Sequence, residues 1–212
     1  MVDMYYMCHY SKLTERKEYV LNLLSKYNLD IKWILDFDKE DINYDDLTKQ
    51  YPKILDTMNM FNRKMSKSEI SLCLKHLAVF RDVVDNDYKN VVVFEDDIIL
   101  VDDFDTKLKE YSKQLPQDYD IYWIGSCCDL HAPTQPELYV YPAQSSRCTH
   151  AYMISNQGCK KMLSLINYLN FPIDWYFNFV IKNLNLKNYW AEPPLSIQNL
   201  TFESAINAGQ VQ

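Results

Sequence analysis

The sequence has few glycines, and this scarcity limits how the chain can bind phosphate. Only three glycines occur among 212 residues. Neither G-x-G-x-x-G nor G-x-x-x-x-G-K is present, so the glycine-rich loops that hold phosphates in dinucleotide-binding and P-loop proteins are excluded. Any diphosphate bound by this chain needs another device, and the one that remains is a metal ion held by acidic side chains.

An excess of basic residues is also lacking. The formal net charge is -7 and the sequence pI is about 5.1. Binding to a nucleic acid duplex requires a basic face that neutralises phosphates, and the sequence shows none. We therefore expect no nucleic acid partner.

Long apolar runs are missing as well. No stretch is long and apolar enough to span a bilayer, so we expect no transmembrane segment. The first twenty residues, "MVDMYYMCHYSKLTERKEYV", carry an acid at the third position and have no basic leader. This pattern is not that of a secretory signal, and it favours a cytoplasmic location.

The six cysteines form no C-x-x-C pair. A chain of this size does not need disulfide staples, so free thiols in a reducing compartment are the simplest interpretation. A zinc site is the alternative, because soft ligands recur within a short span at Cys127, Cys128, His131, Cys148 and His150. Structural zinc sites usually have tighter and more regular spacing, which argues against it.

The sequence does contain a regular alternation of strand-like and helix-like segments. Strand patterns cover 4–10, 31–37, 90–94, 119–125, 137–143, 149–155 and 187–197, and helix patterns cover 14–27, 66–86, 103–115, 156–169 and 173–184. The alternation predicts an α/β fold with a mainly parallel, Rossmann-like sheet and flanking helices. The length favours one domain over residues 1–212. Ser66 and Glu69 match a capping box at the start of the second helix.

One stretch, "NVVVFEDDIILV" at 90–101, places three consecutive acids directly after a buried strand. Ligands of open α/β sheets bind outside the carboxyl ends of the strands, which is where Glu95, Asp96 and Asp97 fall. Like charges beside a core are costly unless a positive charge joins them. A divalent cation such as Mn²⁺ or Mg²⁺ would provide it, while a solvated strand end is the alternative interpretation.

The segments "SEISLCLKHLAVF" and "VVVFEDDIIL" together resemble the paired signature of family-25 glycosyltransferases. This family includes collagen galactosyltransferases and bacterial lipooligosaccharide galactosyltransferases. Further pieces occur in the family's order, among them "LTERKEYV", "YDIYWIG", "THAYMIS", "FPIDWYF" and "EPPLSIQN". The resemblance spans nearly the whole chain. It implies a single-domain A-type glycosyltransferase fold and a metal-dependent, inverting transfer of a hexose, galactose or glucose, from a UDP-sugar.

The chain departs from the family signature at several positions. Ser68 and Ser71 stand where the family has glycine, Leu72 stands at the signature's cysteine, and Lys75 replaces the serine before His76. These changes either retune the donor pocket or mark a degraded enzyme. The intact acidic triplet favours an active protein.

The resemblance assigns roles on the donor side. Asp97 is expected to bind the metal most directly, Glu95 to hold the metal's waters or share its coordination, and Asp96 to face the ribose of the donor. Arg16 matches an early basic position of the family and Asp36 lies at the end of the second strand, and both are expected to contact the donor. A surface charge and a turn acid are their respective alternatives.

Inverting transfer in one step needs a base that takes the proton of the acceptor hydroxyl. Asp174 in "FPIDWYF" is the predicted base, flanked by Trp175 and Tyr176, which could stack on sugar rings. A helix-start acid stabilised by the dipole is its alternative role. His150 is considered for the metal shell or the acceptor, and His76 is expected to be a buried histidine that supports the site.

The expected partners are the nucleotide-sugar donor and an acceptor that is a glycan, a lipid-linked sugar or a protein hydroxyl. Two other functions stay open at this stage. A metal-dependent phosphodiesterase could use the same acids, but further metal motifs are missing. A non-catalytic glycan- or partner-binding member of the family is the other, and the glycine-to-serine departures motivate it.

Overall fold

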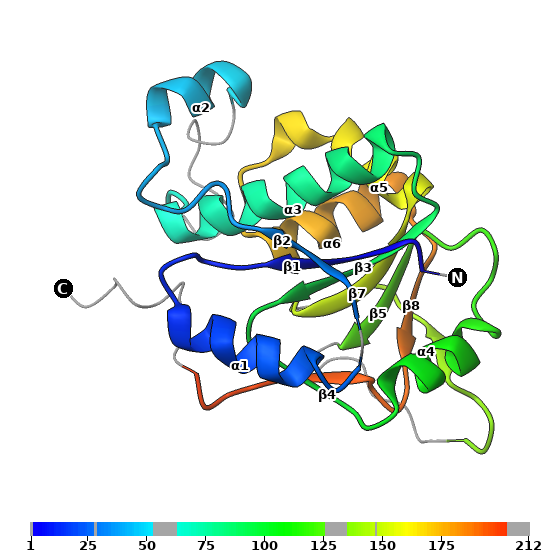
Figure 1. Ribbon diagram of the computed structural model, residues 1–212. Helices are drawn as coiled ribbons and strands as arrows, with labels where there is room; N and C mark the ends of the chain where they lie inside the picture. The colour runs from blue at the N-terminus through cyan, green and yellow to red at the C-terminus, as the bar shows by residue number, and fades with distance from the viewer. Residues whose placement is uncertain (1, 28, 53–62, 126–134, 147, 203–212) are drawn as a thin grey trace.

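The computed structural model describes residues 2–27, 29–52, 63–125, 135–146 and 148–202. A seven-stranded sheet forms its centre, with the strand order β2-β1-β3-β7-β5-β8-β6 (Figure 1). The strands are β1 (Met4–Cys8), β2 (Ile31–Ile34), β3 (Asn90–Glu95), β5 (Ile121–Gly125), β6 (Val140–Pro142), β7 (Ala151–Ser155) and β8 (Asn188–Ala191).

The sheet is mainly parallel in strand direction, as predicted. Strands β2, β1, β3, β5 and β8 run the same way, while β7 and β6 run against their neighbours, which makes five of seven strands codirectional. The fold class is confirmed. The sequence pattern gave no sign that β7 is inserted antiparallel between β3 and β5, because the direction of pairing depends on long-range topology rather than on local periodicity.

Helices cover both faces of the sheet. They are α1 (Thr14–Leu24), α2 (Tyr44–Gln50), α3 (Lys67–Asp85), α4 (Phe104–Ser112), α5 (Asn156–Ser164), the 3₁₀ turn η1 (Ile166–Tyr168) and α6 (Ile173–Leu184). Figure 1 shows α3, α5 and α6 on one face, and α1 and α4 on the other. Two apolar clusters follow this division, one on each face of the sheet.

The long helix α3 begins at the predicted capping box. The Ser66 hydroxyl accepts a hydrogen bond from the Glu69 amide at 3.3 Å, and the Glu69 carboxylate accepts one from the Ser66 amide at 2.7 Å. Arg63 adds two hydrogen bonds to the same carboxylate, at 2.7 and 2.5 Å. The start of α3 is thus fixed beside the sheet edge where the acids lie.

A second, two-stranded sheet joins β4 (Ile98–Leu100) to β9 (Ser196–Gln198). The antiparallel register pairs Ile98 with Gln198, so the chain just after the acidic triplet lies against the chain that follows β8. This pairing brings Gln198 to Asp97, although the two residues are 101 positions apart.

No helix within the described ranges is long and apolar enough to cross a membrane. The cytoplasmic location stays a prediction, and so does the assignment of one domain to residues 1–212. Among the described cysteines, Cys8, Cys73, Cys148 and Cys159 are free thiols. The alternative zinc ligands Cys127, Cys128 and His131 lie outside the described residues.

Candidate active site at the carboxyl ends of β1 and β3

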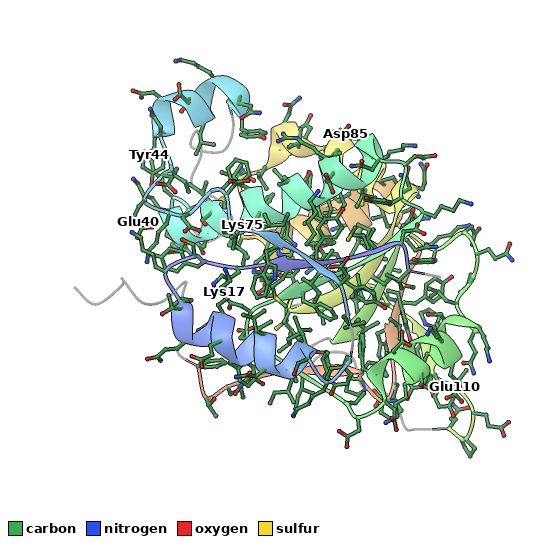
Figure 2. All side chains as sticks on the ribbon, in the orientation of Figure 1. Lys17, Glu40, Tyr44, Lys75, Asp85 and Glu110 are labelled. Atoms are coloured by element: carbon green, nitrogen blue, oxygen red, sulfur yellow. The ribbon has the colours of Figure 1, made fainter. Side chains whose placement is uncertain are left out.

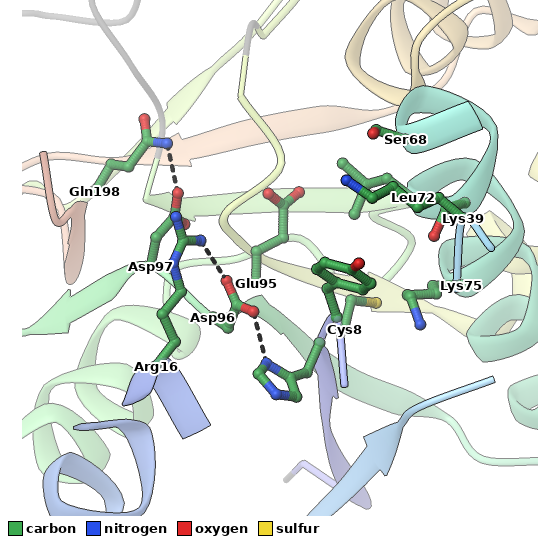
Figure 3. Close-up of a pocket in the computed structure, with 13 residues that line it drawn as sticks. Cys8, Arg16, Lys39, Ser68, Leu72, Lys75, Glu95, Asp96, Asp97 and Gln198 are labelled. Atoms are coloured by element: carbon green, nitrogen blue, oxygen red, sulfur yellow. Dashed lines mark hydrogen bonds and ion pairs between the residues drawn. The ribbon is translucent and has the colours of Figure 1, made fainter. Parts of the chain in front are cut away.

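Strand register brings the first and third strands' ends together. β1 and β3 are parallel neighbours that pair Cys8 with Glu95, so His9 and Asp96 follow side by side. A pocket with an empty volume of about 670 Å³ opens at this edge. Its lining includes all three acids of the triplet together with Arg16, Lys39, Lys75, Tyr10 and Gln198 (Figure 3).

Asp96 is neutralised within the protein. One carboxylate oxygen lies 2.6 Å from Nδ1 of His9, and the other accepts a hydrogen bond from Arg16 at 2.8 Å. Burial opposes ionisation of Asp96, but the hydrogen bonds from His9 and Arg16 outweigh it and lower the pKa of the carboxyl. The Arg16 guanidinium also lies over the Phe202 ring, 5.0 Å from its centroid. Asp96 therefore needs no further cation.

Glu95 is held by one side chain from α3 and one from the segment just before β7. The Thr149 hydroxyl donates to Oε1 at 2.5 Å, and Nε2 of His76 lies 3.3 Å from the same oxygen. Nδ1 of His76 lies 2.7 Å from the Tyr152 hydroxyl, which orients the ring. Burial raises the pKa of Glu95, but His76 and Thr149 overcome it and lower the pKa. The prediction that His76 is buried is confirmed, and its contact with Glu95 agrees with the supporting role expected for it.

Asp97 differs from both neighbours. Gln198 donates to its Oδ2 at 2.7 Å, while Oδ1 is buried without a hydrogen-bond partner among the described residues. Burial and the adjacent Glu95 charge raise the pKa of Asp97 to about 6. Asp97 is thus the one acid of the triplet that has no cationic hydrogen-bond partner in the described chain.

Glu95 and Asp97 are compatible with a divalent cation, but they form an incomplete ligand set. No group of three or more His, Cys, Asp or Glu side chains is placed to hold a metal in the described part of the chain. Hard cations accept carboxylate and phosphate oxygens together, so a cation here would take part of its coordination from a bound ligand. The raised pKa of Asp97 and its unpaired oxygen fit that arrangement.

A second pocket adjoins the first. Glu95, Leu72 and Gln198 line both, and Asp174, Thr149 and His150 belong to the second. Asp174 lies in the first turn of α6 and accepts a hydrogen bond from the Trp175 amide at 2.8 Å. The structure therefore places the predicted base in a pocket that shares a wall with the acidic triplet.

A comparison with protein families shows which family this chain belongs to. The model for "Glycosyltransferase family 25 (LPS biosynthesis protein)" matches residues 4–177. The chain belongs to glycosyltransferase family 25. The sequence resemblance to this family is therefore confirmed.

Curated relatives are distant, and their matches cover from 48% to 91% of this family-25 chain. Human procollagen galactosyltransferase 2 is 23% identical over 220 residues, which cover 91% of this chain and 34% of the relative. A bovine protein named "Probable inactive glycosyltransferase 25 family member 3" is 26% identical over 108 residues, covering 48% of this chain and 18% of the relative. The chain spans about a third of the length of the first relatives that it matches, 34% in the human protein.

A solved structure supports the fold class. A glycosyltransferase involved in glycosylation of the major capsid of PBCV-1 is similar with a TM-score of 0.51 and 7% identity, covering 97% of this chain and 98% of that one. At this identity the likeness concerns the fold alone, and it agrees with the predicted A-type glycosyltransferase architecture.

Not every predicted residue of this family-25 site faces the pocket. The Asp36 side chain is exposed and does not line either pocket, and its carbonyl accepts a hydrogen bond from Lys75 at 2.6 Å. The buried acid nearby is Asp38, which lies 2.8 Å from Lys75 and also binds Ser11. Figure 2 shows Lys75 inside the molecule beneath α3, at the β2 edge. The departure at Lys75 thus has a structural use, because it fixes the loop after β2.

One aromatic expectation was wrong. Tyr176 is fully buried and donates its hydroxyl to the Met162 carbonyl at 2.6 Å, so it cannot stack on a sugar ring. His150, also buried, points toward the end of β5, where a Cβ added to Gly125 would lie 2.6 Å from Nε2 of His150. Glycine is required at that position because of this close approach.

Sequence reasoning did not identify His9, Thr149, Tyr10, Lys39 or Gln198 as part of the site. A signal for His9 exists in the sequence, because "MCHY" and "FEDD" are both strand ends and parallel pairing aligns the residues that follow them. Gln198 carries no comparable signal, since it reaches Asp97 through the pairing of β4 with β9.

Proposed function

We propose that this chain moves a hexose, galactose or glucose, from a UDP-sugar to an acceptor hydroxyl, with inversion and with Mn²⁺ or Mg²⁺ bound. The observation that carries the proposal is the contrast inside the acidic triplet. Asp96 is neutralised by His9 and Arg16, whereas Asp97 keeps a buried oxygen without a partner in the described chain. An A-type fold with such an acid at the end of β3 fits the binding of a metal and a diphosphate.

Glu95 and Asp97 would hold the cation, which when bound supplies positive charge to the departing diphosphate. Glu95 is oriented for this role by His76 and Thr149. Gln198 holds one oxygen of Asp97 and leaves the other for the ion. Because the neighbouring acids are already fixed, little reorganisation is needed when a ligand binds.

The donor occupies the first pocket in this proposal. Asp96, fixed by Arg16, faces the ribose. Asp36 contributes through its backbone carbonyl, which accepts a hydrogen bond from Lys75. This bond fixes the loop after β2, next to which the nucleobase lies in this proposal. The departures at Ser68 and Ser71 line the same pocket, so they adjust the donor side and do not disrupt the acids.

The acceptor occupies the second pocket. Asp174 takes the proton from the acceptor hydroxyl while the acceptor oxygen bonds to the anomeric carbon and the bond from that carbon to the diphosphate breaks. The electron pair of the broken bond leaves with UDP. The two pockets share Glu95, Leu72 and Gln198 in their linings, which supports a base that acts from the pocket next to the one that takes the nucleotide.

The acceptor class is a glycan, a lipid-linked sugar or a protein hydroxyl. The similarity to procollagen galactosyltransferase 2 favours a protein hydroxyl and galactose. The family model, described by its link to LPS biosynthesis, favours a saccharide acceptor. These are alternatives for one site, since each offers a hydroxyl to the same base.

A donor screen tests the proposal without knowledge of the acceptor. Purified protein is incubated with UDP-galactose, UDP-glucose and other UDP-sugars, with Mn²⁺, with Mg²⁺ and with chelator, and released UDP is measured. We expect slow, metal-dependent release of UDP from one of the first two. Release of UMP and hexose 1-phosphate instead would indicate a phosphodiesterase and contradict the proposal.

A non-catalytic sugar-nucleotide binder is the second candidate. The similarity to a bovine protein named as probably inactive supports it, since that match covers 48% of this chain. The screen separates the two functions when binding is measured alongside. A binder would show metal-dependent affinity for a UDP-sugar, with no UDP released above the rate without protein.

A further inference from the structure

Besides His9, the first pocket is lined by one arginine and two lysines, Arg16, Lys39 and Lys75, and they differ in which groups they pair with. Arg16 lies 2.8 Å from Asp96, and Lys75 lies 2.8 Å from Asp38, so each is paired with a buried acid. Lys75 is also bound by two backbone carbonyls, at 3.2 and 2.6 Å. Neither cation has its full charge available for a ligand.

Lys39 is the third of these basic residues, and its surroundings are different. Within the described chain, no carboxylate lies at ion-pair distance from its ammonium group, which instead lies over the Tyr10 ring, 5.1 Å from the centroid. Figure 3 shows the Lys39 side chain extending from its loop into the pocket, toward the side where Glu95 and Asp97 lie.

The Tyr10 ring that supports Lys39 is itself held in place. Its hydroxyl donates to Glu40 at 2.5 Å. Lys12 also lies 3.4 Å from this carboxylate, but both side chains are exposed to solvent, so the pair contributes little. Figure 2 shows Glu40 at the edge of the molecule. Tyr10 and Lys39 thus form a wall of the pocket that is ordered by contacts made outside it.

We propose that Lys39 binds the diphosphate of the nucleotide-sugar donor and stabilises the charge that UDP gains as it leaves. This inference rests on the proposed function. A diphosphate placed between the acids and the loop after β2 would meet the metal ion on one side and the Lys39 ammonium on the other. An unpaired ammonium group forms strong charge-assisted hydrogen bonds with phosphate oxygens. The chain has no glycine-rich loop whose backbone amides could bind the phosphates in place of such a side chain.

The alternative role for Lys39 is to offset the negative charge of the triplet in the absence of ligand. The two roles predict different results when the charge is removed. A diphosphate ligand loses affinity in the first case. In the second case the acids bind Mn²⁺ more tightly, and affinity for the diphosphate does not fall.

The test uses three variants of the full chain. Lys39→Met removes the charge and keeps the aliphatic stem, and Lys39→Arg keeps the charge. Lys12→Met is the matched control, because Lys12 is a nearby cation that contacts Glu40 but does not line the pocket. Affinities for UDP, uridine and pyrophosphate are measured in the presence of Mn²⁺, and thermal melting checks that each variant is folded.

We expect Lys39→Met to weaken UDP and pyrophosphate binding about tenfold or more and to leave uridine binding within about twofold. Lys39→Arg should restore most of the affinity, and Lys12→Met should behave like the wild type. Unchanged UDP affinity in Lys39→Met would overturn the inference. An equal loss of uridine and UDP would also overturn it, because Lys39 would then support the pocket wall and not the phosphates.

Failure of the inference can be distinguished from failure of the proposed function. A wild-type protein that binds pyrophosphate through Lys39 but no UDP would contradict the UDP donor and support the phosphate contact. A wild-type protein that binds neither would contradict both.

Discussion

The two sides of the acidic triplet differ in how they treat buried carboxylates. On the side of β1 and β2, Asp96 is bound by His9 and Arg16, and Asp38 is bound by Lys75. On the side of β4 and β9, a carboxylate oxygen of Asp97 and the hydroxyl of Ser196 are buried without partners among the described residues. Paired charges hold a fold together, whereas unpaired ones cost stability and are retained where a ligand completes them.

Asp96 and Asp97 show this contrast at adjacent positions, just after the end of β3. Ionisation is favoured at Asp96 by the hydrogen bonds from His9 and Arg16, and it is opposed at Asp97 by burial and by Glu95. One substitution, Asp to Asn, should therefore change stability with opposite signs at adjacent positions. This is the sharpest way to break the comparison.

The largest effect is expected for Asp96→Asn, which leaves the His9 and Arg16 side chains without their carboxylate. Breaking a buried ion pair typically costs about 3 kcal/mol or more, so we expect a loss of that size in the free energy of unfolding at pH 7. The folded-state pKa of Asp96 is lowered, so its contribution is present above pH 4 and is lost as the pH falls through that folded-state pKa. Urea unfolding of both proteins at pH 7 and pH 3 should show the difference shrinking at the lower pH.

The second largest effect is expected for Asp174→Asn, and it should appear in the rate of sugar transfer and not in stability. If Asp174 takes the acceptor proton, transfer should fall about 10²-fold or more, while UDP-sugar affinity and melting temperature change little. Asp105→Asn is the matched control, since Asp105 also lies in the first turn of a helix but outside both pockets of the site. Near wild-type transfer by Asp174→Asn would remove it from the mechanism. Asp129 and Glu203 would then be the next acids to test as the base, and both lie outside the described residues.

Asp97→Asn should stabilise the protein when no divalent cation is present. The pKa of Asp97 is raised to about 6 in the folded chain, so folding loses stability as the pH rises from about 4 to about 6. At about 1.4 kcal/mol for each pKa unit, the substitution should recover up to about 3 kcal/mol at pH 7.5 and little at pH 4. Melting in the presence of chelator measures this, and the exposed Asp30 provides an Asp→Asn control with no expected gain. A destabilised Asp97→Asn at pH 7.5 would mean that Asp97 is already paired.

Much of the fold was predictable from the sequence, because the apolar periodicity of individual segments is a local property. The capping box at Ser66 and Glu69 and the strand that ends at Glu95 were identified this way. The reversed direction of β7 and β6 was not, since it results from pairing between distant segments. The site residues divide in the same way, because local patterns identified some of them and others depend on contacts between distant segments.

The acids were found because they break an apolar run, whereas their partners were missed because they come from other strands. His9 reaches Asp96 across 87 positions and Gln198 reaches Asp97 across 101. In the loop after β2, the sequence did not indicate which of two nearby acids is buried. Phe37 has a positive φ of 66°, and beyond this turn the buried acid is Asp38 rather than the predicted Asp36. A turn of this kind is hard to read from sequence when it contains no glycine.

The central claim is that Asp97 is completed by a cation that also binds the donor diphosphate. Titration calorimetry of UDP into the wild type and into Asp97→Ala, each with Mn²⁺ and with chelator, tests it most directly. The account predicts tight binding only for the wild type with Mn²⁺, and a variant that stays folded but does not bind. Equal affinity of the wild type for UDP with and without the metal would contradict it.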